Sequence, residues 1–201
     1  MAKKKIKKPN KPYDFEGVNP KKWVADKFIL GCDPGSKNFG ISLVGIHKGK
    51  VKVFANSVLM HPVDTLVEFG QAKEKFLAEI AAWMSLVPIN GIVAERFQTR
   101  GNGGPLIEQV SVMLGLMAGT YPKVPIKLTI ASAWKNKFNK RFNTDLKEIY
   151  PDVAVQPHQL DATLIGVFGL EAGLSTNIDY DPDDIIAQVE ATTLLEHRRM
   201  K

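Results

Sequence analysis

The chain has 201 residues, of which 44% are hydrophobic and 24% charged, and its formal net charge is +6. This length suits one well-buried domain and excludes two large ones, and the composition is ordinary for a soluble globular protein. No apolar run approaches the length of a membrane span, so the sequence predicts no membrane partner.

The net charge is concentrated at the start of the chain. Residues 1–27 hold nine lysines against three acidic residues, whereas the rest of the chain carries 18 basic and 18 acidic side chains. This Lys-rich, Pro-containing tail has no apolar periodicity, so we expect it to be disordered. Two roles are equally open for it: holding a polyanion without reading its sequence, or solubilising the protein.

The basic start does not predict export. Pro9, Asn10, Pro12 and Asp14 stand where a signal peptide would have its apolar segment. The single cysteine, Cys32, cannot form an internal disulfide, which fits a reducing compartment. The prediction is therefore a cytoplasmic protein.

The first elements after the tail are three short apolar runs. Residues 28–32, 39–46 and 51–57 are separated by turn residues, a pattern that predicts an antiparallel meander of strands. Residues 63–86 then place their apolar side chains on one helical face, and Pro88 prevents that helix from continuing.

The second half alternates strands and helices. Residues 89–95 predict a buried strand, which is followed by a polar, Gly-rich loop. The further predicted elements, in chain order, are a helix at 105–119, a strand at 125–129, a helix at 132–138 capped by Ser132, a helix at 158–172 and a final helix that opens at Asp181. Residues 139–156 show no clear pattern. One core with this element order predicts an α/β fold with a mixed sheet.

Four polar groups occupy positions that structure alone would not require. Asp33 ends the first strand and Glu95 ends the fourth. His158 and Asp161 stand one helical turn apart, so both project from one face of a helix that is otherwise apolar. Each has an ordinary alternative, namely a turn aspartate, a solvated strand end, a backbone-bonded histidine or a helix-start acid. The set as a whole is harder to explain in that way, because buried carboxylates are normally paired or bound to metal.

The same residues carry a resemblance. The chain has Asp33 before Pro-Gly within residues 29–40 (ILGCDPGSKNFG), then Glu95, then the His158-x-x-Asp161 pair. These motifs, in this order, resemble those of the RuvC family of Holliday-junction resolvases. Residues 131–135 (ASAWK) also resemble a segment that precedes the late helix in many relatives. The resemblance covers residues 28–172, and a small phage-type member acting in the host cytoplasm would fit it.

The resemblance implies an RNase H-like fold, which is a mixed five-stranded sheet flanked by helices. The nuclease domain is expected at residues 28–178, after the basic tail at 1–27. Residues 179–201 are expected to form a C-terminal helical extension.

The resemblance also implies a metal site. Strands one and four are neighbours in such a sheet, so Asp33 and Glu95 would end side by side, and His158 and Asp161 would lie over the same edge. Oxygen ligands with one imidazole suit Mg²⁺ or Mn²⁺. Two such ions per site, about 3.5–4 Å apart, would clamp the scissile phosphate and activate a water. Lys135 is the candidate cation beside the cleaved phosphate, its alternative being a solvated lysine.

Candidate DNA contacts surround this centre. Arg96, Gln98 and Arg100 lie in the Gly-rich loop, and Lys135 adds a further positive charge. Phe97 follows Glu95 by two residues and would share its face of the strand. It is expected either to stack on an unpaired base or to pack into the core.

The expected activity is metal-dependent endonucleolytic cleavage of four-way junctions and other branched DNA by paired nicks. The resemblance implies a homodimer, for which the helices at 63–86 and 105–119 are candidate surfaces.

A flap or fork endonuclease, or an RNA-processing nuclease of the same fold, stays open as an alternative. A non-catalytic protein that binds branched DNA is the alternative from another class, although clustered acids repel phosphate unless metal occupies them. An ATPase of the actin and sugar-kinase type would need two such domains, which 201 residues cannot supply.

Overall fold

The structure is a computed structural model that describes residues 19–35, 38–60, 66–96, 105–173, 178 and 180–193. Residues 60, 66–72 and 105–108 are described by their backbone alone. The strands are β1 (Lys27–Pro34), β2 (Asn38–His47), β3 (Lys50–Met60), β4 (Gly91–Glu95) and β5 (Ile126–Thr129). The helices are η1 (Pro20–Lys22), α1 (Leu66–Met84), α2 (Pro105–Thr120), α3 (Ala131–Phe142), α4 (Leu146–Ile149), η2 (Tyr150–Asp152), α5 (Pro157–Gly173) and α6 (Pro182–Thr192).

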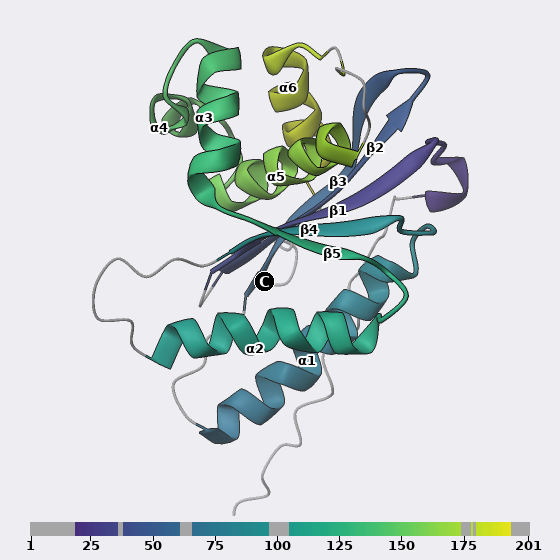
Figure 1. Ribbon diagram of the computed structural model, residues 1–201, viewed down its shortest axis with the longest axis vertical. Coiled ribbons are helices and arrows are strands. Elements are labelled where there is room, and N and C mark those ends of the chain that lie inside the picture. The colour runs from purple at the N-terminus through teal and green to yellow at the C-terminus, as the bar shows by residue number, and fades with distance from the viewer. Residues whose placement is uncertain are drawn as a thin grey trace, which may run out of the picture.

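The strands form one five-stranded mixed sheet in the order β3-β2-β1-β4-β5 (Figure 1). β1 pairs antiparallel with β2 and parallel with β4, from Ile29 opposite Gly91 to Cys32 opposite Ala94. The α/β class, the mixed sheet and the adjacency of the first and fourth strands are thereby confirmed.

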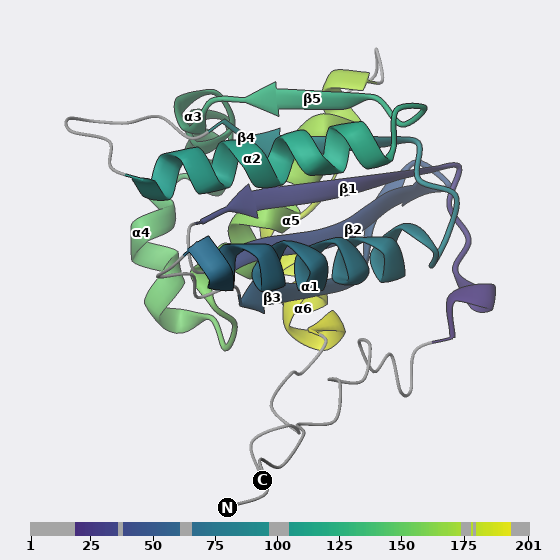
Figure 2. The ribbon, with the colours of Figure 1, turned by 90° about the horizontal axis from the view of Figure 1, so that it is seen from below.

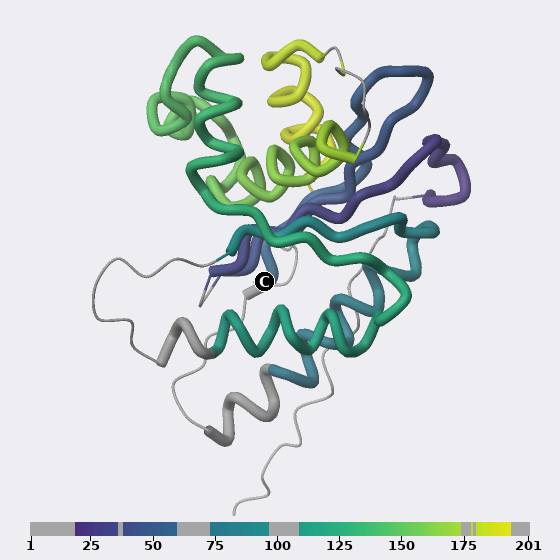
Figure 3. The backbone as a smooth tube through the Cα atoms, viewed as in Figure 1, coloured from purple at the N-terminus to yellow at the C-terminus, as the bar shows by residue number. Residues whose placement is uncertain are grey.

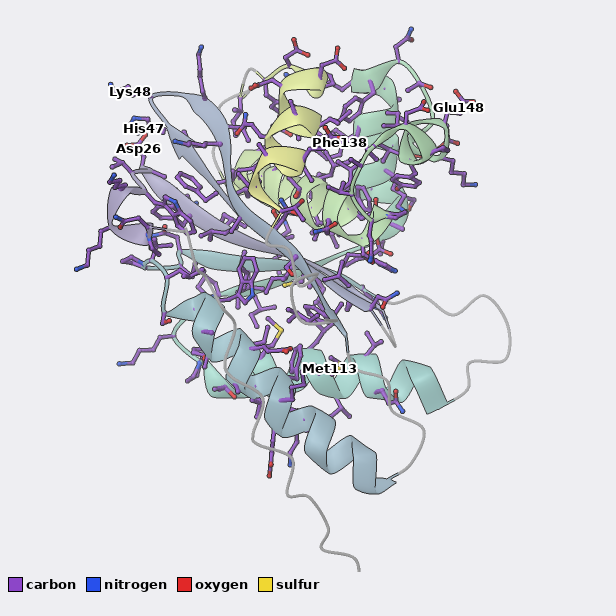
Figure 4. The ribbon with its side chains drawn as sticks, turned by 180° about the vertical axis from the view of Figure 1, so that it is seen from behind. Asp26, His47, Lys48, Met113, Phe138 and Glu148 are labelled. Carbon is purple, nitrogen blue, oxygen red and sulfur yellow. The ribbon has the colours of Figure 1, made fainter. Side chains whose placement is uncertain are left out.

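Alternation along the strands divides the core into two layers. On β1, Phe28, Leu30 and Cys32 pack towards α1 and α2, whereas Ile29 packs towards α5. Figure 2 shows α1 and α2 lying across the first of these faces. Figure 3 shows α5 crossing the other face, with α3, α4 and α6 beyond it. Met113 lies between α2 and the sheet, and Phe138 lies among the helices of the α5 layer (Figure 4).

One local expectation, the Ser132 cap, needs correction. The residue before α3 is Ile130, no side chain caps this helix, and Ser132 already lies inside it. Residues 139–156 showed no pattern, yet they contain the end of α3, the short helix α4 and the turn η2. Elements this short carry too little periodicity to be recognised from sequence.

The final helix joins the main core, although the predicted division of the chain at residue 178 stays a prediction. Ile185 and Val189 of α6 are buried in the α5 layer. The Asn56 side chain on β3 donates a hydrogen bond to the Val189 carbonyl at 2.8 Å. Among the described helices, none is long and apolar enough to cross a membrane.

Glycines let α5 lie directly on the sheet. A methyl group on Gly31 would lie 2.6 Å from the backbone nitrogen of Gly166 and 2.8 Å from its Cα. A methyl group on Gly40 of β2 would lie 2.8 Å from the carbonyl carbon of His158. The backbones therefore touch without intervening side chains, which brings the start of α5 against the ends of β1 and β2.

Gly31→Ala is expected to destabilise the fold by about 3 kcal/mol, because backbone atoms of α5 cannot yield to a methyl group as a side chain can. Gly115→Ala on α2 is the matched control, since a methyl group there meets nothing within 4 Å. The control should be neutral or stabilising by about 0.5–1 kcal/mol. Urea denaturation of both variants measures the difference, and equal stabilities would contradict the close packing of α5 on β1.

Candidate metal centre

Asp33 and Glu95 lie at neighbouring strand ends. The β1–β4 register ends at Cys32 opposite Ala94, so each carboxylate is the next residue of its strand. Ile29 on β1 and Val93 on β4 belong to the α5 layer, and alternation places Asp33 and Glu95 on the same face as these residues. The predicted juxtaposition of these two carboxylates at one sheet edge is what the strand register produces.

The start of α5 brings His158 to this edge. The His158 Nδ1–H donates a hydrogen bond to Asp33 Oδ2 at 2.6 Å, and both side chains are partly buried. This hydrogen bond raises the pKa of His158, and it outweighs burial, which lowers the pKa. The pair links the tip of β1 to the first turn of α5.

Asp161, one turn further along α5, is buried and held by two donors. Lys135 Nζ of α3 lies 3.0 Å from Oδ2, and the Tyr150 hydroxyl donates to Oδ1 at 2.5 Å. Burial raises the pKa of Asp161, as does the negative charge of Asp33, whereas Lys135 and Tyr150 lower it. The carboxylate thus lies in a place that disfavours its charge, and local donors compensate.

Glu95 has a partner from α3. The indole Nε1–H of the fully buried Trp134 donates to Glu95 Oε2 at 2.7 Å. Burial raises the pKa of Glu95 and the Trp134 hydrogen bond lowers it, while the charges of Asp33 and Asp161 raise it further. The three carboxylates therefore act on one another electrostatically, as groups that share one site do.

This donor set fits a divalent cation by chemistry. Asp33, Glu95 and Asp161 offer hard oxygen ligands and His158 offers a nitrogen, a combination suited to Mg²⁺ or Mn²⁺. A bound cation would also offset the cost of keeping these buried carboxylates charged, and their mutual repulsion, which together raise the pKa of Glu95 and Asp161. Among the residues that the structure describes, however, no three His, Cys, Asp or Glu side chains converge as a metal-binding group. Instead, each of the three carboxylates accepts a hydrogen bond from a protein donor, and His158 is the donor to Asp33. Binding a cation therefore requires some of these hydrogen bonds to exchange.

Apart from Asp33, Glu95, His158 and Asp161, two of the predicted site residues are described. Lys135 lies in the centre, on Asp161, and Arg96 is exposed at the end of β4. Phe97, Gln98 and Arg100 lie outside the described residues, so their DNA contacts stay predictions.

Two residues of the centre were not anticipated. Trp134 precedes Lys135 in a helix whose other side chains are mostly polar or basic, and an indole donor in that setting was an available signal. Tyr150 lies in the stretch without periodicity, and nothing in the sequence pointed to its contact with Asp161.

The stability of the metal-free protein is expected to fall as pH rises. Asp161, Glu95 and His158 all have raised pKa values, so the folded state binds their protons more tightly than the unfolded state does. The His158 contribution is fully present below its ordinary value of 6.5 and is lost as pH rises through its raised pKa. Urea denaturation in a metal chelator at about pH 5.5 and about pH 8 measures the trend.

Mn²⁺ should reverse this trend, because it binds the deprotonated side chains and stabilises the folded state by an amount that grows with the logarithm of its concentration over its dissociation constant. His158→Gln should remove the part of the decline that lies above pH 6.5. A metal-free stability that is flat or rising over this range would contradict the arrangement described here.

No family model matches the chain, and no curated protein sequence matches it, whereas solved structures do. RuvC of Thermus thermophilus in complex with a Holliday junction substrate superposes with a TM-score of 0.59 and 18% identity, covering 73% of this chain and 96% of RuvC. A second structure of Thermus thermophilus RuvC gives a TM-score of 0.57 and 19% identity over 73% of this chain and 96% of that chain. The yeast mitochondrial Holliday junction resolvase Ydc2 matches more weakly, with a TM-score of 0.48 and 12% identity over 84% of this chain and 79% of Ydc2. The chain shares the RNase H-like fold of RuvC, over almost the whole length of that protein.

Proposed function

We propose that the protein is a metal-dependent endonuclease that cuts four-way junctions and other branched DNA by paired nicks. The observation that carries this proposal is the placement of Asp33, Glu95, His158 and Asp161 at one edge of a RuvC-like sheet, where Asp33 and Glu95 end neighbouring strands and His158 contacts Asp33. Five separate segments of the chain supply these residues and their partners: β1, β4, α3, η2 and the start of α5. Ordinary strand-end or helix-start roles do not explain why these polar side chains lie at the same edge of the sheet.

In this proposal the four side chains hold two Mg²⁺ or Mn²⁺ ions. Bound there, the metal ions would activate a water and stabilise the leaving oxygen of the phosphodiester. The protein's own contribution is orientation. Trp134 fixes one oxygen of Glu95, and the glycine contacts of α5 set His158 and Asp161 against the sheet edge. We also propose that Lys135, whose ammonium lies on Asp161, neutralises charge beside the cleaved phosphate.

The substrate part of the proposal has two supports. The RuvC structure that this chain resembles holds a Holliday junction, and the chain covers nearly all of that protein. The lysines of residues 1–27 supply positive charge for phosphates without sequence reading. Two symmetric nicks in a four-way junction require two sites, so we propose a homodimer with one site in each subunit.

The test is a cleavage panel. The purified chain is incubated with Mg²⁺ or Mn²⁺ and labelled four-way junction, flap, duplex and RNA–DNA hybrid substrates, and the cuts are mapped. We expect paired, symmetric nicks in the junction, with little cutting of duplex. Preferential cutting of the flap or the hybrid would contradict the junction as the substrate and favour the one that is cut. Tight junction binding without cleavage in the presence of either metal would contradict the enzyme activity and favour a non-catalytic DNA-binding protein.

A further inference from the structure

The two donors to Asp161 differ in how firmly they are held. Tyr150 belongs to η2, is followed by Pro151, and packs against the α5 layer of the core. Its hydroxyl donates to Asp161 Oδ1 at 2.5 Å, as a neutral phenol does. Its position is set by the backbone and by packing rather than by its hydrogen bond alone.

Lys135 is held more loosely. Its side chain is 37% exposed, against 10% for Asp161, and its ammonium lies over the ring of Trp134 at 4.8 Å from the centroid. A long side chain with a solvent path and an aromatic face beside it can leave Asp161 without burying an unpaired charge. Asp161 Oδ2 is therefore the oxygen whose partner can exchange at low cost.

We propose that Tyr150 is a positioning residue that fixes Asp161 through Oδ1, so that Oδ2 exchanges the Lys135 ammonium for a divalent cation. This inference rests on the proposed function, because it concerns the same metal site. It assigns the two donors opposite effects. Tyr150 supports cation binding by orienting the Asp161 carboxylate. Lys135 competes with the cation for one oxygen, and its ammonium leaves Asp161 when the cation binds.

Isothermal titration of the full, metal-free chain with Mn²⁺ tests both effects without relying on cleavage. Tyr150→Phe keeps the ring and removes the donor, so Mn²⁺ affinity should fall roughly tenfold, as it does when a hydrogen bond to a metal ligand is lost. Lys135→Met removes the competing charge and should tighten binding by roughly threefold, a modest factor because the lysine is partly exposed.

Tyr180→Phe is the matched control. Tyr180 packs in the same layer as Tyr150, and within the described residues its buried hydroxyl has no hydrogen-bond partner. Its Mn²⁺ affinity should equal that of the wild type. Melting temperatures of all variants in chelator ensure that binding is compared on folded protein.

The outcomes separate this inference from the function beneath it. If the wild type does not bind Mn²⁺, the metal site fails and both proposals fall. If the wild type binds and Tyr150→Phe binds equally well, the positioning role of Tyr150 is overturned while the metal site stands. If Lys135→Met weakens binding, Lys135 supports the site rather than competing for it, and the exchange is overturned. Should Tyr150→Phe fail to fold, the Lys135→Met result still decides the exchange.

Discussion

Replacing Asp33 or Asp161 with Asn, or Glu95 with Gln, is expected to abolish DNA cleavage while leaving junction binding intact or tighter. Each change keeps the shape of the side chain and removes one negative charge from the proposed metal ligands. A loss of at least about a thousandfold in cleavage rate, or about 4 kcal/mol of transition-state stabilisation, is expected for each variant. Binding should not suffer, because fewer negative charges face the phosphates.

Single-turnover cleavage and a gel-shift assay, performed on the same preparations, measure the two effects separately. Glu148→Gln is the control, because Glu148 is an exposed carboxylate on α4 whose partner is Thr144 (Figure 4). This control should cleave at the wild-type rate. Near-wild-type cleavage by any two of the three site variants would refute the assignment of these carboxylates as metal ligands.

The second large effect is expected at His158, where the test separates a metal ligand from a structural histidine. A histidine ligand must be neutral, so metal affinity should fall as pH drops through its raised pKa. His158→Ala should lose most of the activity, with partial recovery in Mn²⁺, which accepts mixed nitrogen and oxygen ligands. His158→Asp restores an oxygen ligand and should keep substantial cleavage with a weaker pH dependence.

Cleavage rates against Mg²⁺ and Mn²⁺ concentration, together with melting temperatures, decide between the two roles. His47→Ala is the control, since His47 ends β2 beside the β2–β3 turn, and the labelled side chains place it at the far end of the sheet (Figure 4). Lys27 pairs with Ile46 whereas Asp33 pairs with Gly40, so six β1 residues, about 20 Å, separate these ends. If His158→Ala only lowers the melting temperature and leaves the metal dependence unchanged, His158 is not a ligand.

The sequence by itself determined the elements and the ends at which the polar groups stand. Apolar runs closed by turn residues predicted the strands, and Asp33 and Glu95 at their ends marked one edge of the sheet once the fold class was inferred. The spacing of His158 and Asp161 placed both on one helical face. These are properties of local periodicity, which acts over a few residues and does not depend on the path of the chain.

The tertiary structure decided the partner of each site residue. Trp134 reaches Glu95 across 39 positions in sequence, and Lys135 reaches Asp161 across 26. Tyr150 reaches Asp161 from a segment without periodicity. These contacts depend on where α3 and η2 lie relative to α5, and the direct glycine packing of α5 on the sheet sets that helix in place. Local sequence patterns do not predict contacts between residues so far apart in the chain. Only closure of the intervening loops and packing of the core bring those side chains together.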